Sequence, residues 1–190
     1  MIEAYPSVPD EPFGYISGSV VFPGGVASVS DRTPVVAASL TAWPFKFDKP
    51  TPIDYARIWL VTHQTGAEAR AGLYSNVDAH PSALLADLGA QALTATSDRA
   101  VTFDANLTVK GWVWLLIWIK NVATQATIRG PGSNFATQQQ FPALDVFLQY
   151  PTFRPYLYIE SAYPGSMPAT APAMIPAFEE KVPLPILGLT

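Results

Sequence analysis

The sequence predicts an all-β protein, a β-sandwich of jelly-roll type with extended proline-rich arms at both ends. Short runs of β-branched and aromatic residues recur along the chain, several of them alternate between apolar and polar positions, and no stretch has the length and period of a long helix. The chain has 190 residues, of which 49% are hydrophobic and 14% charged. One domain with a substantial core is therefore expected.

The positions of the 19 prolines divide the chain. Eight lie at or before Pro52, Pro81 stands alone in the middle, and ten follow from Pro131 onward. Proline has no amide donor and is excluded from central strands and helix interiors, so residues 53–130 are expected to hold the continuous hydrogen-bonded core. The predicted organisation is an N-terminal arm with room for a hairpin (residues 1–34), a β-sandwich domain (35–160) and an extended apolar C-terminal arm (161–190).

Candidate strands are spread along the whole chain, and two of them alternate clearly enough to predict their orientation. In residues 68–74 the alanines and Leu73 are expected on the buried face. In residues 99–104, Val101 and Phe103 are expected to point inward. The other candidate strands are residues 13–22, 26–29, 35–45, 56–62, 111–120, 144–149 and 156–160. One short helical turn is expected over residues 83–86, and Gly89 would end it.

The strand predicted over residues 111–120 is apolar on both faces. Successive side chains of a strand point to opposite sides. One face then carries Trp112, Trp114, Leu116 and Trp118, and the other carries Val113, Leu115, Ile117 and Ile119. The aliphatic row suits a sandwich interior. Each tryptophan can bury roughly 150–250 Å², so the tryptophan row exceeds the apolar patch that monomers usually expose and has to be covered.

Three coverings of the tryptophan row are compatible with the sequence. The proline-rich arms of the same chain can lie across it, a neighbouring subunit of a homo-oligomer or shell can pack on it, or a sugar can stack on the indole rings. Trp43 and Trp59 are interpreted as ordinary core or rim residues rather than ligand contacts.

The C-terminal arm is rich in both proline and apolar residues, whereas a solvated linker would normally be polar. It is therefore expected to dock, either on its own domain or on a neighbour, and deleting residues 164–190 is expected to impair assembly but to leave the domain folded. The candidate residues for an interface or a glycan platform are Trp112, Trp114, Trp118, Ile175, Phe178, Leu184, Ile186 and Leu187.

Composition argues against several classes of partner. The formal net charge is −4 with 11 Lys and Arg residues, so a basic face for nucleic acid is not expected. No apolar run approaches the roughly 20 residues that cross a bilayer, so membrane insertion is not expected. The chain has no cysteine, which excludes disulfides and thiolate zinc sites within it.

No catalytic constellation is visible in the sequence. The HExxH, GxxxxGK[ST] and GxSxG patterns are absent. The two histidines, His63 and His80, lie in predicted loops or at strand ends, and the carboxylates Asp54, Glu68, Asp87, Asp98 and Asp104 are scattered singly. Asn76, Asp78 and Asp87 could offer oxygens to a structural calcium ion, but a tight turn explains the first two more simply. The prediction is a protein without catalytic residues, metal or cofactor.

The middle of the chain resembles a module that recurs in the virion proteins of tailed phages, namely head fibres, decoration proteins and tail-fibre or appendage proteins. The matching stretches are DYARI (residues 54–58), ARAGLY (69–74), HPSALLADLG (80–89) and GWVWL (111–115). The resemblance extends over residues 35–130 and, more loosely, over residues 141–144. Similar sandwiches also occur in secreted surface proteins and carbohydrate-binding proteins. The resemblance implies a β-sandwich used for display or assembly on a particle, without catalysis.

The leading hypothesis is a structural virion protein, a decoration, head-fibre or tail-appendage subunit that forms homo-oligomers and contacts other capsid or tail proteins. The alternative is a carbohydrate-binding module that recognises a host-surface glycan. A hydrolase acting on surface polysaccharide ranks third, because it would need two carboxylates, or a histidine beside a nucleophile, in one cleft. The sequence offers neither at local spacing.

Overall fold

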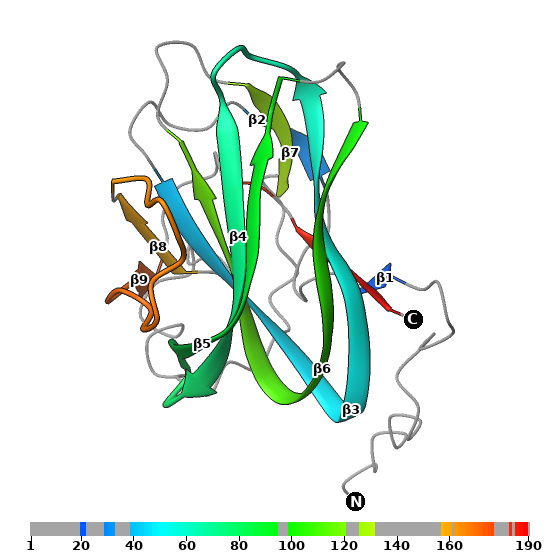
Figure 1. Cartoon of the computed structure of the whole chain (residues 1–190), viewed down its shortest axis with the longest axis vertical. Coiled ribbons are helices and arrows are strands. Elements are labelled where there is room, and N and C mark those ends of the chain that lie inside the picture. Colours follow the sequence, from blue (N-terminus) through cyan, green and yellow to red (C-terminus); the bar gives the residue numbers. More distant parts are fainter. Residues whose placement is uncertain are drawn as a thin grey trace, which may run out of the picture.

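The computed structural model describes residues 20–21, 29–32, 39–94, 99–120, 126–131, 157–160, 162–176, 183 and 185–189. These residues form a ten-stranded antiparallel β-sheet with no helix among them, so the all-β prediction is confirmed for this part of the chain. The sheet curls into a half-barrel (Figure 1). Its strands are β1 (Val20–Val21), β2 (Val29–Arg32), β3 (Ser39–Thr62), β4 (Glu68–Val77), β5 (His80–Ala92), β6 (Arg99–Ile119), β7 (Thr127–Pro131), β8 (Leu157–Glu160), β9 (Ile175–Pro176) and β10 (Ile186–Leu189).

The two longest strands, β3 and β6, pair along most of their length and bend together (Figure 1). Their register shifts between Phe47 and Thr51, where β3 carries more residues than β6, and Gly111 of β6 has a φ of 77°. Extra residues on one strand bend a ribbon and increase its twist. Because of this bend, the first half of β3 and the second half of β6 face the remaining halves of the same two strands across the core.

One edge of β3 pairs with β6. The prolines of β3 lie where its other edge has no partner among the described strands. That edge pairs with β8 over residues 39–42, then with β10 over residues 53–57, and then with β7 near Leu60. Pro44, Pro50 and Pro52 fall between the first two pairings. A proline without an amide hydrogen fits such an unpaired stretch. The continuous sheet therefore starts at residue 39, earlier than the predicted limit at residue 53.

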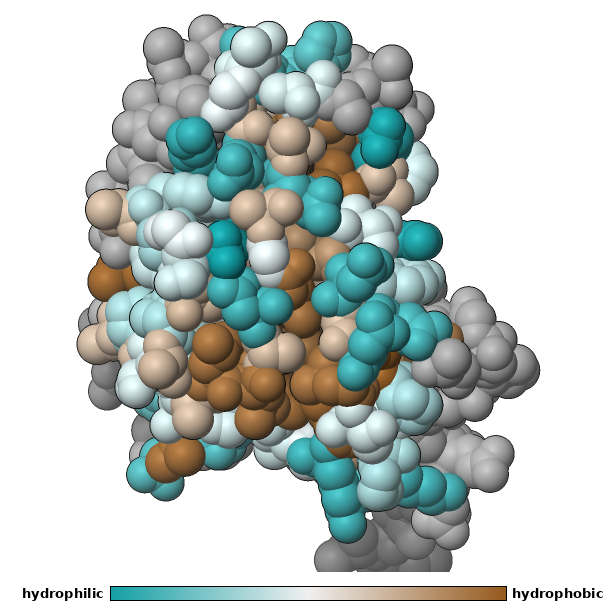
Figure 2. Space-filling model, viewed as in Figure 1, coloured by the Kyte–Doolittle hydropathy of each residue, from teal (hydrophilic) through white to brown (hydrophobic). Residues whose placement is uncertain are grey.

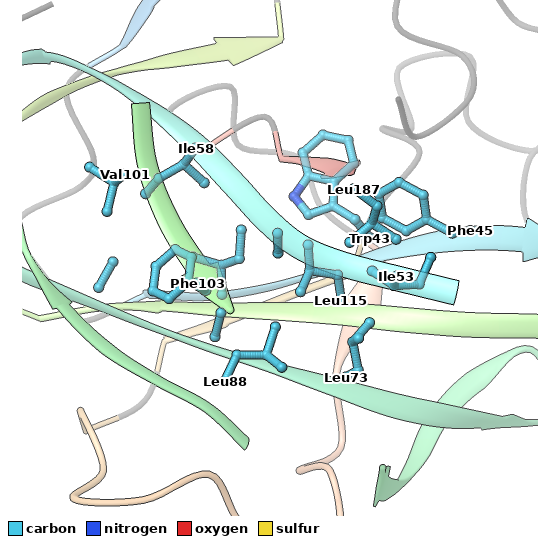
Figure 3. Close-up of a cluster of buried hydrophobic side chains, with 14 of the residues drawn as sticks. Trp43, Phe45, Ile53, Ile58, Leu73, Leu88, Val101, Phe103, Leu115 and Leu187 are labelled. Atoms are coloured by element: carbon cyan, nitrogen blue, oxygen red, sulfur yellow. The ribbon is translucent and has the colours of Figure 1, made fainter. Parts of the chain in front are cut away.

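The main core fills the space between the facing halves of the sheet (Figure 3). Val113, Leu115, Ile117 and Ile119 are all buried in it, and so are the inward residues predicted for β4 and for the first half of β6. Leu187 and Leu189 of β10 belong to the same core. The last strand of the predicted C-terminal arm is thus an integral strand of the sheet.

The helical turn expected over residues 83–86 is wrong, because these residues lie in β5 and pair with β4. Leu73 pairs with Ala86 and Tyr74 with Leu84, so the register shifts by one residue at this point. Leu84 consequently joins a different apolar cluster from Ala86 and Leu88. The shift breaks the period-2 pattern, and a broken pattern of apolar residues resembles a helical one.

Apolar surface also gathers in the lower half of the face viewed in Figure 2, framed by polar side chains. Among the described residues, Ala86 of β5 and Ala105 and Leu107 of β6 are only partly buried and pack against the main core.

Of the other candidate strands, residues 144–149 and most of 13–22 and 26–29 lie outside the described residues.

Candidate functional site

The predicted tryptophan row forms the centre of a second apolar cluster, on the opposite side of β6 from the main core. Trp114 is 1% exposed and Trp118 is 4% exposed. They are covered by Leu157 of β8 and by residues 162–174, called here the strap, whose Met167 and Met174 are buried in the same cluster. For these two rings, the described residues provide the first of the three predicted coverings, a segment of the same chain.

The strap is held to the sheet by backbone pairing with β5. Leu84 N donates a hydrogen bond to Ala169 O at 2.9 Å, and Ala171 N donates one to Ser82 O at 2.7 Å. Tyr74, which is fully buried, donates from its hydroxyl to Pro168 O at 2.7 Å. The prolines of the strap prevent continuous pairing of this segment, so a few individual hydrogen bonds fix its path.

Asp87 is the polar centre of this contact. Its Oδ2 lies 2.6 Å from Arg70 Nη2 and accepts a hydrogen bond from Met167 N at 3.1 Å, while its Oδ1 accepts one from Gly89 N at 2.9 Å. Burial alone would raise the pKa of the Asp87 carboxyl, but the hydrogen bonds from Arg70, Gly89 and Met167, together with the charge of Arg70, hold that pKa below its usual 3.8. The ionised carboxylate thus links β4, β5 and the strap.

A second polar contact secures the beginning of the strap. The Tyr163 hydroxyl donates a hydrogen bond to Glu68 Oε1 of β4. Burial, followed by the neighbouring Glu68 carboxylate, raises the pKa of the Tyr163 hydroxyl above its ordinary value of 10.0. Tyr163 therefore stays a neutral donor at physiological pH.

Two of the stretches that carry the sequence resemblance, residues 69–74 and 80–89, supply residues that contact the strap. Arg70 and Asp87 form the ion pair, Gly89 donates to Asp87, and Tyr74 binds Pro168. A Cβ on Gly72 would lie 3.0 Å from both Cγ and Cε of Met167, so the Met167 side chain packs closely on this glycine. These motif residues have a structural role in holding the strap, and sequence reasoning did not anticipate it because the strap lies about eighty positions away in the chain.

The other predicted interface residues are dispersed. Trp112 is half-buried and lies opposite Lys46 in the β3–β6 pairing. Ile186 is half-buried and Leu187 is fully buried in the main core. Ile175 is described only by its backbone in β9, and Phe178 and Leu184 lie outside the described residues. With the strap in place, Trp112 is the accessible member of the tryptophan row.

The oxygens considered for calcium are otherwise engaged. Asn76 Oδ1 accepts a hydrogen bond from Trp114 Nε1 at 2.8 Å, and Asp87 binds Arg70. Asp78 and Ala79 form the two-residue connection between β4 and β5 with φ values of 48° and 63°, which is the geometry of a tight hairpin turn. Within the described part of the chain, no group of three His, Cys, Asp or Glu residues is placed to hold a metal ion.

Both histidines lie at the ends of strands. The His80 Nδ1 atom lies 2.7 Å from Asp78 O at the hairpin turn. His63 is exposed at the end of β3. In the same described ranges, no helix is long and apolar enough to cross a membrane.

A different set of side chains forms an accessible aromatic surface. Tyr55, Arg57 and Trp59 alternate along β3 with Ala56, Ile58 and Leu60, which are buried in the main core. The first three residues, called here the outer row, therefore share the opposite face of the sheet. Trp59 is 41% exposed, the largest exposed aromatic surface among the described residues.

The outer row is held in a defined geometry. Arg57 Cζ lies 3.8 Å from the centre of the Tyr55 ring, within the range of a cation–π contact. Arg57 Nε donates a hydrogen bond to Thr102 Oγ1 of β6 at 2.9 Å. The Tyr55 ring lies over the backbone of β10 at Gly188, where an added Cβ would overlap the ring. Glycine at this position lets the ring approach the backbone of β10 closely.

Sequence reasoning identified residues 56–62 as a strand but interpreted Trp59 as a core or rim residue. The signal that could have separated it from the core was the strict alternation of YARIWL, in which aromatic and cationic residues occupy every second position. The contacts with Thr102 and Gly188 come from distant parts of the chain and leave no local pattern.

Comparisons with known proteins find a distant structural likeness. No family model matches the chain, and no curated protein matches it. Among solved structures, the fold is similar to the crystal structure of the cysteine protease and lectin-like domains of Cwp84, a surface layer associated protein of Clostridium difficile, with a TM-score of 0.52 and 11% sequence identity. The matched region covers 85% of this chain but 36% of the Cwp84 chain, so this chain spans little more than a third of the length of the protein it matches. At this identity the likeness shows a shared β fold alone.

Proposed function

We propose that this protein is a non-enzymatic carbohydrate-binding module that recognises a cell-surface glycan through the outer row of Tyr55, Arg57 and Trp59. The observation that carries the proposal is an exposed indole, Trp59, beside an arginine whose position is fixed by a ring and a hydroxyl. The distant likeness to a protein that contains a lectin-like domain supports the same function.

The physical basis is the chemistry of a sugar ring. A pyranose has a flat array of C–H groups that packs on an aromatic face, and its rim of hydroxyls needs polar partners. The outer row offers both, because Trp59 presents apolar aromatic surface and Arg57 presents N–H donors. The row stands on β3, which pairs with β6 and β10 at this level. A rigid sheet surface of this kind needs little ordering when a ligand binds.

A glycan array with the full chain tests this function, followed by titration of any hit with Trp59→Ala. Two variants serve as matched controls. Trp112→Ala removes the same kind of side chain from the tryptophan row, and Leu85→Ala removes an apolar side chain that is 47% exposed on β5. We expect hits whose affinity falls at least about tenfold in Trp59→Ala and stays unchanged in both controls.

The remaining outcomes have different meanings. Loss of binding in Trp112→Ala alone would move the platform to the tryptophan row and refute the outer row as the site. An array without reproducible hits would refute carbohydrate binding altogether.

We also propose, as a second candidate, an assembly role in a tailed-phage virion, as a subunit with a jelly-roll sandwich and docking arms. The observation in its favour is that two stretches of the virion-module resemblance supply one connected contact, made by Arg70, Gly72, Tyr74, Asp87 and Gly89. Size-exclusion chromatography with light scattering tests the oligomer, and location and copy number in an intact particle test the role. A monomer that is absent from particles would refute it.

A further inference from the structure

The charge environment of Arg57 differs from that of Arg70, another half-buried arginine of the sheet. Arg70 is neutralised by Asp87 at 2.6 Å. Among the described residues, Arg57 has the Tyr55 ring and the Thr102 hydroxyl as its neighbours and is not paired with a carboxylate. A guanidinium is always charged at physiological pH and is strongly stabilised by a carboxylate or phosphate. An arginine whose side chain is held in place and has no carboxylate partner is suited to bind an anionic ligand.

The geometry leaves the right atoms of Arg57 for such a ligand. Nε is used by Thr102 Oγ1 and one face of the guanidinium is used by Tyr55. The N–H groups of Nη1 and Nη2 remain, and this terminal pair of nitrogens matches the two oxygens of a carboxylate. Because the ring and the hydroxyl already hold the side chain, little rotamer entropy is lost when the ligand binds.

The neighbours of Arg57 define where a sugar would lie. Trp59 is two residues away on the same face, about 7 Å along the strand. The residue opposite Trp59 on β6 is Ala100, which is small. The exposed Asp104 lies on the other side, opposite Tyr55. An acidic sugar would avoid Asp104 and would place its ring on Trp59 with its carboxylate at Arg57.

We propose that the outer row selects acidic glycans, with the terminal nitrogens of Arg57 binding a sugar carboxylate while the ring stacks on Trp59. This inference rests on the proposed carbohydrate-binding function and adds the class of ligand. It commits the face to an acidic polysaccharide rather than to a second copy of this chain or to a protein partner.

The test compares polygalacturonate with its carboxyl-reduced form, a neutral polymer of the same linkage, by isothermal titration calorimetry with the full chain at low and at physiological salt. We expect binding of the acidic polymer that weakens with salt and at least about tenfold weaker binding of the reduced polymer. Arg57→Gln should lose at least about tenfold in affinity, as expected for a hydrogen bond to a charged group. Arg57→Lys, which keeps the charge without the paired nitrogens, should recover part of it.

Arg99→Gln is the matched control, because Arg99 is an exposed arginine on β6 and its loss changes the net charge by the same amount. Its affinity should equal that of the unmodified chain. Thermal unfolding of each variant establishes folding, and Thr102→Val gives a second variant that keeps the Arg57 charge but frees its side chain. Thr102→Val should weaken binding of the acidic polymer more than binding of the reduced one.

The outcomes separate this inference from the function it rests on. Equal binding of the two polymers, sensitive to Trp59→Ala but not to Arg57→Gln, would overturn the acidic specificity and leave carbohydrate binding intact. Equal loss in Arg57→Gln and Arg99→Gln would overturn it as well, since net charge alone would then explain binding. A glycan array with no hits, or a dimer in light scattering that Trp59→Ala dissociates, would overturn both.

Discussion

Replacing Asp87 with alanine should release the strap. The substitution removes the ion pair to Arg70 and the hydrogen bonds from Met167 N and Gly89 N. Arg70 would then keep a charge at a side chain that is only 15% exposed, and the Met167 amide would lose its acceptor in a partly buried place. Hydrogen bonds to charged groups contribute roughly 1.5–3 kcal/mol each, but Gly89 is accessible to water. The expected loss of unfolding free energy is therefore about 2–4 kcal/mol in total.

Two measurements on the Asp87→Ala variant distinguish strap release from general weakening. Urea denaturation gives the loss of unfolding free energy. Acrylamide quenching of tryptophan fluorescence reports locally, because Trp114 and Trp118 lie under the strap. We expect greater quenching in the variant under conditions where the sheet remains folded by circular dichroism.

Asp48→Ala provides the matched control for the same residue type. Asp48 pairs with Lys46 at 3.2 Å, but both side chains are more than half exposed, and such pairs contribute about 0.2–1 kcal/mol. Quenching should be unchanged in this control. A loss below about 0.5 kcal/mol in Asp87→Ala, with the rings still protected, would refute the role of Asp87 and leave Met167 and Met174 as the contacts that hold the strap.

Four further changes test the same description of the molecule. Ile117→Asp should destabilise the protein by several kcal/mol, about 4 or more, because the side chain is 1% exposed in the main core; a variant that unfolds at the normal urea concentration would contradict its inward position. Deleting residues 164–190 should prevent folding, since it removes β10 and most of the strap; a folded truncation by circular dichroism would restore the sequence-based expectation. In acid, the lowered pKa of Asp87 means that its contribution to stability is complete above about pH 4 and is lost as pH falls through the pKa of the folded state. Asp87→Asn should therefore flatten the acid limb of a plot of stability against pH. In alkali, burial and then the Asp87 charge raise the pKa of Tyr74 to about 12. The contribution of Tyr74 to stability is therefore complete below about pH 10 and declines as pH rises toward that pKa. Tyr74→Phe should make the alkaline limb of the plot of stability against pH shallower, and an unchanged limb would contradict this assignment.

The parts of the fold that the sequence predicted were those that depend on local alternation. The two apolar faces of residues 111–119 and the inward positions of Leu73, Val101 and Phe103 follow from side chains pointing alternately up and down a strand, and the structure confirms them. The all-β class follows from the same pattern. The helical turn at residues 83–86 was wrong because the register shift between β4 and β5 disturbs that alternation.

The parts that the sequence did not predict depend on contacts between distant residues. Nothing near Asp87 indicates that its carboxylate accepts a hydrogen bond from Met167, and nothing near Gly188 indicates that the Tyr55 ring lies over it. The positions of the outer-row residues on one face of β3 could be predicted from their local spacing. Their fixed geometry could not, because it depends on Thr102 and on β10. Residues 175, 178 and 184, predicted as interface residues, stay predictions.

The position of β10 bears on how the chain folds during synthesis. β10 lies between β1 and β3, so a segment synthesised long after both of its neighbours is inserted between them. Until residues 186–189 emerge, β1 lacks its neighbour and the main core lacks Leu187 and Leu189. Long-range pairings of this kind slow folding and leave strand edges open while translation continues. The nascent protein should therefore need protection from aggregation until β10 has paired, and a pause in translation before residue 186 would prolong the state with open strand edges.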